Sequence, residues 1–122
     1  MTALEDLRDQ VRQFAHERDW EQFHNPKNLA MAMAAEAAEV LEIFQWLTAE
    51  QSSAIMTDPR TAEAVRHELA DVLSYLLHLA DVLEVDLGSA LQEKLRINER
   101  RYPADKARGR SDKYDVLGNS DQ

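Results

Sequence analysis

The chain has 122 residues, 44% of them hydrophobic, which is about the size and composition of one domain with a single core. Its formal net charge of −9 disfavours nucleic acids and anionic membranes as partners, because both would be repelled. The absence of cysteine excludes disulfides, thiolate nucleophiles and zinc–thiolate sites.

Targeting and membrane signals are not recognisable in the sequence. The N-terminal segment does not pair a basic stretch with an apolar one as a signal peptide does. The apolar runs fall short of the roughly 20 residues that span a bilayer. We therefore expect a soluble, cytoplasmic protein.

Helical periodicity dominates the chain. Only three Gly and three Pro occur, and the longer segments repeat apolar residues about every 3.6 positions without strand-like alternation. An all-α chain with four helices is predicted. The first helix should begin in a capping box at Thr2 and Glu5 and fade near Arg18. Residues 18–28 should connect it to the next helix.

The second and third helices each begin with a capping residue followed by proline, namely Asn25 with Pro26 and Asp58 with Pro59. The second helix is predicted to end at Trp46 or Leu47, and the third near Leu83. The connection over residues 48–57 has room for one short helical turn.

A fourth helix is predicted from a cap at Asp86 to Tyr102, where Pro103 ends it. Beyond this proline the chain turns polar, which predicts irregular structure and a disordered end. The predicted domains are a helical domain over residues 1–103 and a basic, partly irregular tail over residues 104–122.

Basic residues gather towards the C-terminus. Between residues 94 and 113 lie eight of the fourteen Lys and Arg residues, while the central helices are acidic. Two interpretations stay open. The segment is either a solvated tail that balances an acidic body or an anion-binding flank beside an acidic site.

Two acidic pairs fall on apolar helix faces. Glu36 lies in the middle of an apolar stripe of the second helix, and Glu39 lies one turn along and about 60° round. On the third helix, apolar residues bracket Glu68, and Asp71 follows one turn further on. Each of these two helices is therefore predicted to present one acidic pair inward.

Four buried carboxylates need neutralisation, because each unpaired ion costs on the order of several kcal/mol. Few Lys or Arg residues lie on the helix faces concerned, so internal ion pairing is insufficient. An all-oxygen ligand set suits a hard divalent cation, and Mg²⁺ is favoured where a substrate phosphate completes its shell. The alternative is that one or both acidic stripes face water in a dimer cleft.

Four blocks of the sequence resemble the MazG-like nucleotide pyrophosphohydrolases, specifically the dCTP pyrophosphatase branch: ERDWEQFHNPKN, AAEAAEVLEIFQW, HELADVLSYLLHLA and INERRYPADKARGRSDKY. The resemblance covers roughly residues 4–115. The family's metal motif, E-x-x-E followed by E-x-x-D, falls on Glu36, Glu39, Glu68 and Asp71.

This resemblance implies an all-α, four-helix bundle-like MazG fold that assembles as a homodimer or homotetramer. It also implies Mg²⁺-dependent hydrolysis of a nucleoside triphosphate to the monophosphate and pyrophosphate. In that reaction the four acidic residues act through a metal-activated water that attacks the α-phosphorus.

By the same resemblance, the residues that bind the substrate are Trp20, His24, Trp46, Tyr75 and Asn98 around the base, with Lys94 and the basic C-terminal segment near the phosphates. Other interpretations stay open for four of them. In most bundles Trp46 and Tyr75 would be core residues, His24 a loop or capping histidine, and Asn98 a polar surface residue.

Two departures from the family pattern bear on the site. Ala35 and Ala38 stand where the family usually has glycine. Val11 stands where the dCTP branch carries a histidine near the base, which leaves the preferred base open.

The predicted function is Mg²⁺-dependent pyrophosphohydrolysis of dCTP or of modified pyrimidine deoxynucleotides, for nucleotide-pool sanitation. Two alternatives come from other classes of protein: a nucleotide-sensing or interaction module without turnover, and a structural helical oligomer. The complete set of four carboxylates favours the enzyme, because a binding module could lose one ligand.

Overall fold

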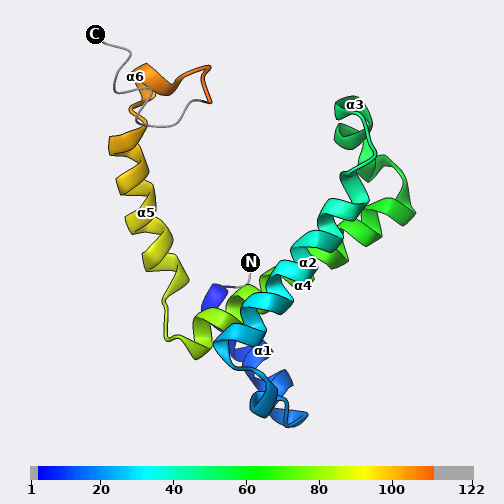
Figure 1. Ribbon diagram of the computed structural model, residues 1–122, viewed down its shortest axis with the longest axis vertical. Coiled ribbons are helices and arrows are strands. Elements are labelled where there is room, and N and C mark those ends of the chain that lie inside the picture. Colours follow the sequence, from blue (N-terminus) through cyan, green and yellow to red (C-terminus); the bar gives the residue numbers. More distant parts are fainter. Residues whose placement is uncertain (1–2, 112–122) are drawn as a thin grey trace. The chain divides into compact units, whose positions relative to one another are not determined.

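The computed structural model describes residues 3–111, and within this range it contains helices and no strand. The prediction of an all-α chain is confirmed. The elements follow the chain in the order α1 (Leu4–Glu17), η1 (Glu21–Phe23), α2 (Pro26–Phe44), α3 (Ala49–Ser53), η2 (Ile55–Thr57), α4 (Pro59–Val82), α5 (Leu87–Arg101) and α6 (Ala104–Ala107) (Figure 1). Among the described residues, no helix has the length and apolar character needed to cross a bilayer.

The predicted helix starts are confirmed by their caps. The side chains of Asn25, Asp58 and Asp86 each accept a backbone N–H bond of 2.9 to 3.0 Å from the first turns of α2, α4 and α5. These bonds satisfy N–H groups that have no partner inside the helix. The helix ends are less accurate, since α2 stops at Phe44, short of the predicted Trp46.

Two short helices lie where the sequence predicted a connection and an irregular tail. The single turn expected in residues 48–57 is α3, which begins in a capping box between Thr48 and Gln51 and is followed by η2. The irregular structure predicted after Pro103 is wrong for residues 104–107, which form α6. Pro103 takes the extended backbone of a helix-start position, so it ends α5 and also precedes a new turn.

Some predictions about the chain ends fall on residues that the structure does not describe. The predicted cap residue Thr2 is one of these, and so is the disordered end beyond residue 111. Within the described range, Ala3 occupies the position before α1 and makes no side-chain cap bond.

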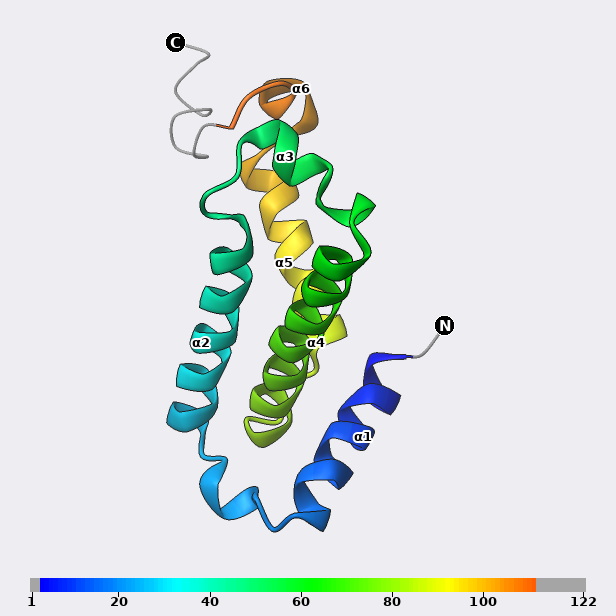
Figure 2. The ribbon, with the colours of Figure 1, turned by 90° about the vertical axis from the view of Figure 1, so that its right-hand side faces the viewer.

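The chain divides into two compact units, Met1–Val85 with α1 to α4 and Asp86–Gln122 with α5 and α6. The domain boundary predicted between residues 103 and 104 stays a prediction. In the first unit, α2 and α4 lie side by side and run in opposite directions, while α1 packs against α4 (Figure 2). This antiparallel pair brings residues of α2 opposite residues of α4.

The core of the first unit is small. Among the described residues, Leu29 of α2 is the one large side chain that is fully buried, at 1% exposure, and Val65 and Leu77 of α4 are buried with it. Large apolar side chains on α2 and α4 stay exposed in the single chain, namely Met31, Leu41, Leu69, Leu73 and Leu76. The described residues of the single chain therefore leave apolar side chains of both helices in contact with solvent.

A charged pair joins α1 to α4. The guanidinium of Arg12 donates two hydrogen bonds to Asp81, one of them 2.9 Å long. The hydrogen bond from Arg12 holds the pKa of Asp81 below its usual range. The pair therefore stabilises the packing of α1 while Asp81 is ionised.

Replacing Asp81 with asparagine should lower the free energy of unfolding by about 1 kcal/mol at pH 7, a modest value because Arg12 is half-exposed. Because the folded pKa is depressed, this stability is complete above the unfolded pKa of about 3.9 and is lost as the pH falls through the folded value. Urea unfolding at pH 7 and near pH 2 measures both. Asp9→Asn is the control, since Asp9 also faces Arg12 but is 56% exposed. A loss that is equal at both pH values would contradict the assignment.

Candidate metal centre and adjoining pocket

Three of the four predicted acidic residues converge where α2 faces α4. Glu36 and Glu39 lie one turn apart on α2, and Glu68 lies on α4. One carboxylate oxygen from each falls within 4.8 Å of the others. The fourth residue, Asp71, is one turn beyond Glu68 and lines a cavity together with Glu36. Glu36 and Glu68 are half-buried, whereas Glu39 and Asp71 are exposed in the single chain, so the prediction of four buried carboxylates is wrong for these two.

The carboxyl groups of this cluster perturb one another. Burial raises the pKa of Glu36, and the neighbouring Glu39 and Asp71 raise it further. Hydrogen bonding with Glu39, followed by burial, raises the pKa of Glu68 to about 7. Both shifts have the direction expected when like charges crowd together and are partly shielded from water. Without a cation, the raised pKa values of Glu36 and Glu68 therefore favour a proton shared within the cluster near neutral pH.

The cluster fits a metal ion by its chemistry. The Oε2 atoms of Glu36 and Glu68 are buried and accept no hydrogen bond from the described residues. Among the described residues of the first unit, every ion pair includes a residue of α1 or its C-cap, and none includes these carboxylates. Buried acceptors that bear negative charge and lack donors are suited to a hard divalent cation. This group can therefore hold a metal.

An open cavity of about 480 Å³ adjoins the cluster, and residues of the first unit line it. One wall comes from α1, where Leu7, Val11 and Phe14 share the apolar stripe of the helix and Gln10 adds a polar group. α1 packs against α4, and that packing places these residues in the cavity lining.

The end of α1 positions Trp20 on the cavity. Asp19 adopts the left-handed region with φ of 54°, and the N–H of Trp20 then donates to the carbonyl of Ala15 at 3.0 Å. This is a Schellman ending, in which the residue after the left-handed one packs back on the helix. Trp20 accordingly lies edge to face against Phe14, with 5.7 Å between the ring centroids. Both aromatic rings line the cavity.

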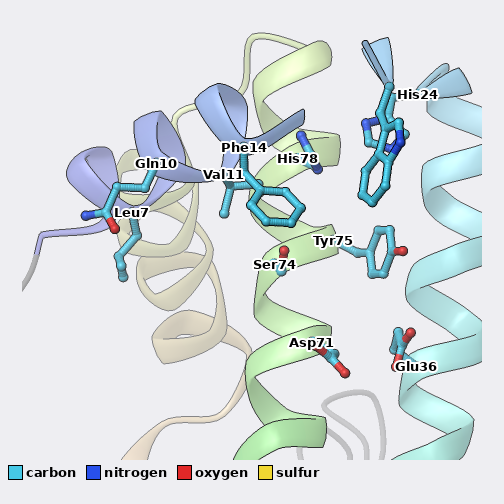
Figure 3. A pocket seen from close by; sticks show the side chains of 11 residues that line it. Leu7, Gln10, Val11, Phe14, His24, Glu36, Asp71, Ser74, Tyr75 and His78 are labelled. Carbon is cyan, nitrogen blue, oxygen red and sulfur yellow. The ribbon is translucent and has the colours of Figure 1, made fainter. Parts of the chain in front are cut away.

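The opposite wall is one face of α4. Asp71, Ser74, Tyr75 and His78 line the cavity, and their spacing of three and four residues places them on one side of the helix (Figure 3). In this view Glu36 and Asp71 lie at one end of the cavity and the histidines at the other, with Ser74 and Tyr75 between them. The cavity thus has an acidic end and an imidazole end.

Two histidines meet at the imidazole end. The ring centroids of His24 and His78 are 4.6 Å apart, with the rings edge to face. The Nδ1 atom of His24 is buried and has no partner among the described residues, and such an atom costs about 1–3 kcal/mol. Burial lowers the pKa of His78 and the His24 ring lowers it further, while Asp81 opposes the shift. His78 is therefore neutral near pH 7.

The structure places three of the six predicted substrate-binding residues in the cavity lining. Trp20, His24 and Tyr75 line the cavity. Trp46 follows the end of α2, is 85% exposed and lies outside the lining of this cavity. Lys94 and Asn98 lie on α5 in the second unit. The roles of these last three residues stay predictions.

Sequence reasoning missed several residues that the structure places in the cavity lining. Ser74 and His78 were detectable, because they continue the helical face of Asp71 and Tyr75. Gln10 and Phe14 gave no such signal. They reach the cavity only through the packing of α1 on α4.

A protein-family model and named proteins of other organisms match most of this sequence. The MazG-like family model matches residues 31–117. Human dCTP pyrophosphatase 1 is 48% identical over 115 residues, which cover 94% of this chain and 68% of the human protein. The rat protein of the same name is 43% identical over the same shares of the two chains.

A solved structure shows the same fold. The crystal structure of a pyrophosphatase from Archaeoglobus fulgidus superposes with a TM-score of 0.77 and is 41% identical in sequence. The match covers 84% of this chain and 94% of the archaeal one.

Proposed function

Since this chain belongs to the MazG-like family, we propose that it hydrolyses a pyrimidine deoxynucleoside triphosphate, dCTP or a modified relative, to the monophosphate and pyrophosphate. The observation that carries this proposal is the continuity of the acidic cluster with an aromatic-walled cavity, through Glu36 and Asp71. One end suits a cation with phosphates and the other a base. Removal of unwanted nucleotides from the pool is the role we propose for the reaction.

We assign Mg²⁺ to the acidic cluster, held by Glu36, Glu39, Glu68 and Asp71. The ion, when bound, supplies charge neutralisation of the phosphates and lowers the pKa of a coordinated water. The chain carries a net charge of −9, so a polyanionic substrate needs this neutralisation. The buried, unpartnered oxygens of Glu36 and Glu68 support the assignment.

The nucleoside is assigned to the cavity beyond the cluster. Trp20 and Tyr75 offer ring faces on which a base can stack, and His24 offers a ring nitrogen to its edge. The apolar wall from α1 excludes water from the base. We propose that Trp46, Asn98 and Lys94 complete the substrate site, the first two beside the base and Lys94 beside the phosphates.

The working form is proposed to be a homodimer or homotetramer. The small core and the exposed leucines of α2 and α4 support this assembly, because a single chain leaves that apolar surface in water. Trp46 is also exposed in the single chain, which supports an assembly that covers it.

Incubation of the pure protein with Mg²⁺ and each deoxynucleoside triphosphate tests the proposal. We expect release of pyrophosphate and the monophosphate, with a pyrimidine preferred, and loss of release when EDTA removes the metal. A modified cytosine triphosphate belongs in the panel beside dCTP. Binding of nucleotide without release from any triphosphate would favour a sensing module, and the absence of binding would favour a structural oligomer.

A further inference from the structure

His78 is a buried polar side chain that the packing of the fold does not explain. It lies near the C-terminal end of α4, on the face towards the cavity, and is 8% exposed. Within the described residues its ring makes an edge-to-face contact with His24 and no hydrogen bond. A buried imidazole without a hydrogen bond is disfavoured unless a ligand or water meets it.

His24, at the same end of the cavity, also lacks a hydrogen-bond partner within residues 3–111 for a ring nitrogen. Its Nδ1 atom is buried and has no partner among the described residues. Trp20 packs against the His24 ring with 6.4 Å between centroids, so the ring is held between an indole and the second imidazole. Two polar rings therefore lie side by side at the end farther from Glu36 and Asp71 (Figure 3), and the Nδ1 atom of His24 is the ring nitrogen that is buried without a partner among the described residues.

We infer that His78 is a specificity-determining residue, which together with His24 forms the hydrogen-bonding surface that reads the edge of the nucleobase. This inference rests on the proposed pyrophosphohydrolase function. If the phosphates lie at the acidic end, the nucleoside extends along Tyr75 and the edge of its base meets the side-by-side imidazoles of His24 and His78.

The chemistry of the pair suits a pyrimidine edge. A neutral imidazole carries one donor and one acceptor nitrogen, and its tautomer follows its partner. Two such rings side by side can present a donor next to an acceptor, which complements N3 and the exocyclic group of a pyrimidine. A protonated ring would offer donors only.

The surroundings of His78 keep it neutral. Burial and the adjacent His24 ring lower its pKa, and Asp81, one turn further along α4, acts in the opposite direction. From α1, Arg12 occupies Asp81 through its two hydrogen bonds, so the carboxylate is already paired. Gln10 is the polar residue that α1 contributes to the same cavity.

The first test measures kcat and KM for His78→Ala and His78→Gln with each deoxynucleoside triphosphate. We expect His78→Ala to lower kcat/KM for the preferred pyrimidine by about three- to tenfold, the worth of one hydrogen bond, mainly through KM. Purine triphosphates, which do not use this edge, should change by less than about twofold. Glutamine keeps a donor and an acceptor and should restore part of the selectivity.

His67→Gln is the matched control, because His67 is an exposed histidine on the same helix and lies outside the cavity lining. A uniform loss over all nucleotides in the His78 variants would overturn the inference and leave the proposed function intact. The absence of release by the unaltered protein from every triphosphate would overturn both.

A second measurement uses the unaltered protein, so it does not depend on how the variants fold. NMR of the ring nitrogens can follow the four histidines, His16, His24, His67 and His78, during titration with dCMP or with inorganic pyrophosphate in the presence of Mg²⁺. We expect dCMP, but not pyrophosphate, to shift His24 and His78, with His16 and His67 unchanged. A His78 signal that ignores dCMP, or that responds equally to pyrophosphate, would overturn the inference.

Discussion

Glu39→Gln is expected to lower the rate of pyrophosphate release by about 100-fold or more, with the fold retained. Glu39 interacts with both other glutamates of the cluster, because hydrogen bonding and charge repulsion with it raise the pKa of Glu68 and, after burial, that of Glu36. Glutamine keeps the shape of the side chain and removes its charge. The expected loss therefore reports on metal binding and not on packing.

The same variant should lose stabilisation by Mg²⁺. A ligand at 100 times its Kd adds about 2.7 kcal/mol to the stability of a protein that binds it only when folded. We expect Mg²⁺ to raise the Tm of the unaltered protein and to leave that of Glu39→Gln nearly unchanged. In metal-free buffer the order should reverse, because the substitution relieves repulsion among the carboxyl groups.

Glu63→Gln is the control, since Glu63 is an exposed glutamate of α4 outside the cluster and the cavity. Its activity and its response to Mg²⁺ should match those of the unaltered protein. If Glu39→Gln retained full pyrophosphate release, the acidic cluster would not be the catalytic metal site.

Leu29→Ala is expected to destabilise the chain by about 2–5 kcal/mol, the range for truncating a buried leucine. Leu29 is 1% exposed and is the one large, fully buried side chain among the described residues. A core this small has little other apolar packing to offset the cavity that alanine leaves. Urea unfolding followed by circular dichroism measures the loss.

Leu41→Ala is the matched control on the same helix, because Leu41 is 60% exposed in the single chain. It should change the stability of one chain by less than about 0.5 kcal/mol. A larger effect that grows with protein concentration would place Leu41 in the proposed subunit interface. Equal losses from both variants at low concentration would contradict the core described for this chain.

Much of the fold was predictable because the deciding interactions are local. The caps Asn25, Asp58 and Asp86 act within one helical turn, and a short run of sequence contains all their partners. The short helix α6 was not predicted, because Pro103 both ends one helix and precedes another.

The candidate site was likewise predictable only where the deciding pattern lies within one helix. The placement of Glu36 and Glu68 on apolar faces follows from helical periodicity within single segments, and so does the face that Asp71 shares with Tyr75. The same periodicity did not predict that Glu39 and Asp71 are exposed. The exposed position of Trp46 was not predictable, because it depends on where α2 ends and on which elements cover that end.

The sequence by itself therefore determined the all-α class, the helix starts and the acidic faces of α2 and α4, since each follows from contacts within a few residues along one helix. Only the tertiary structure decided that α1 forms one wall of the cavity, that Trp20 meets Phe14 across a left-handed turn, and that His24 meets His78. His24 and His78 are separated by many residues and by two helices. Their contact depends on how α4 packs against its neighbours, which no local pattern encodes.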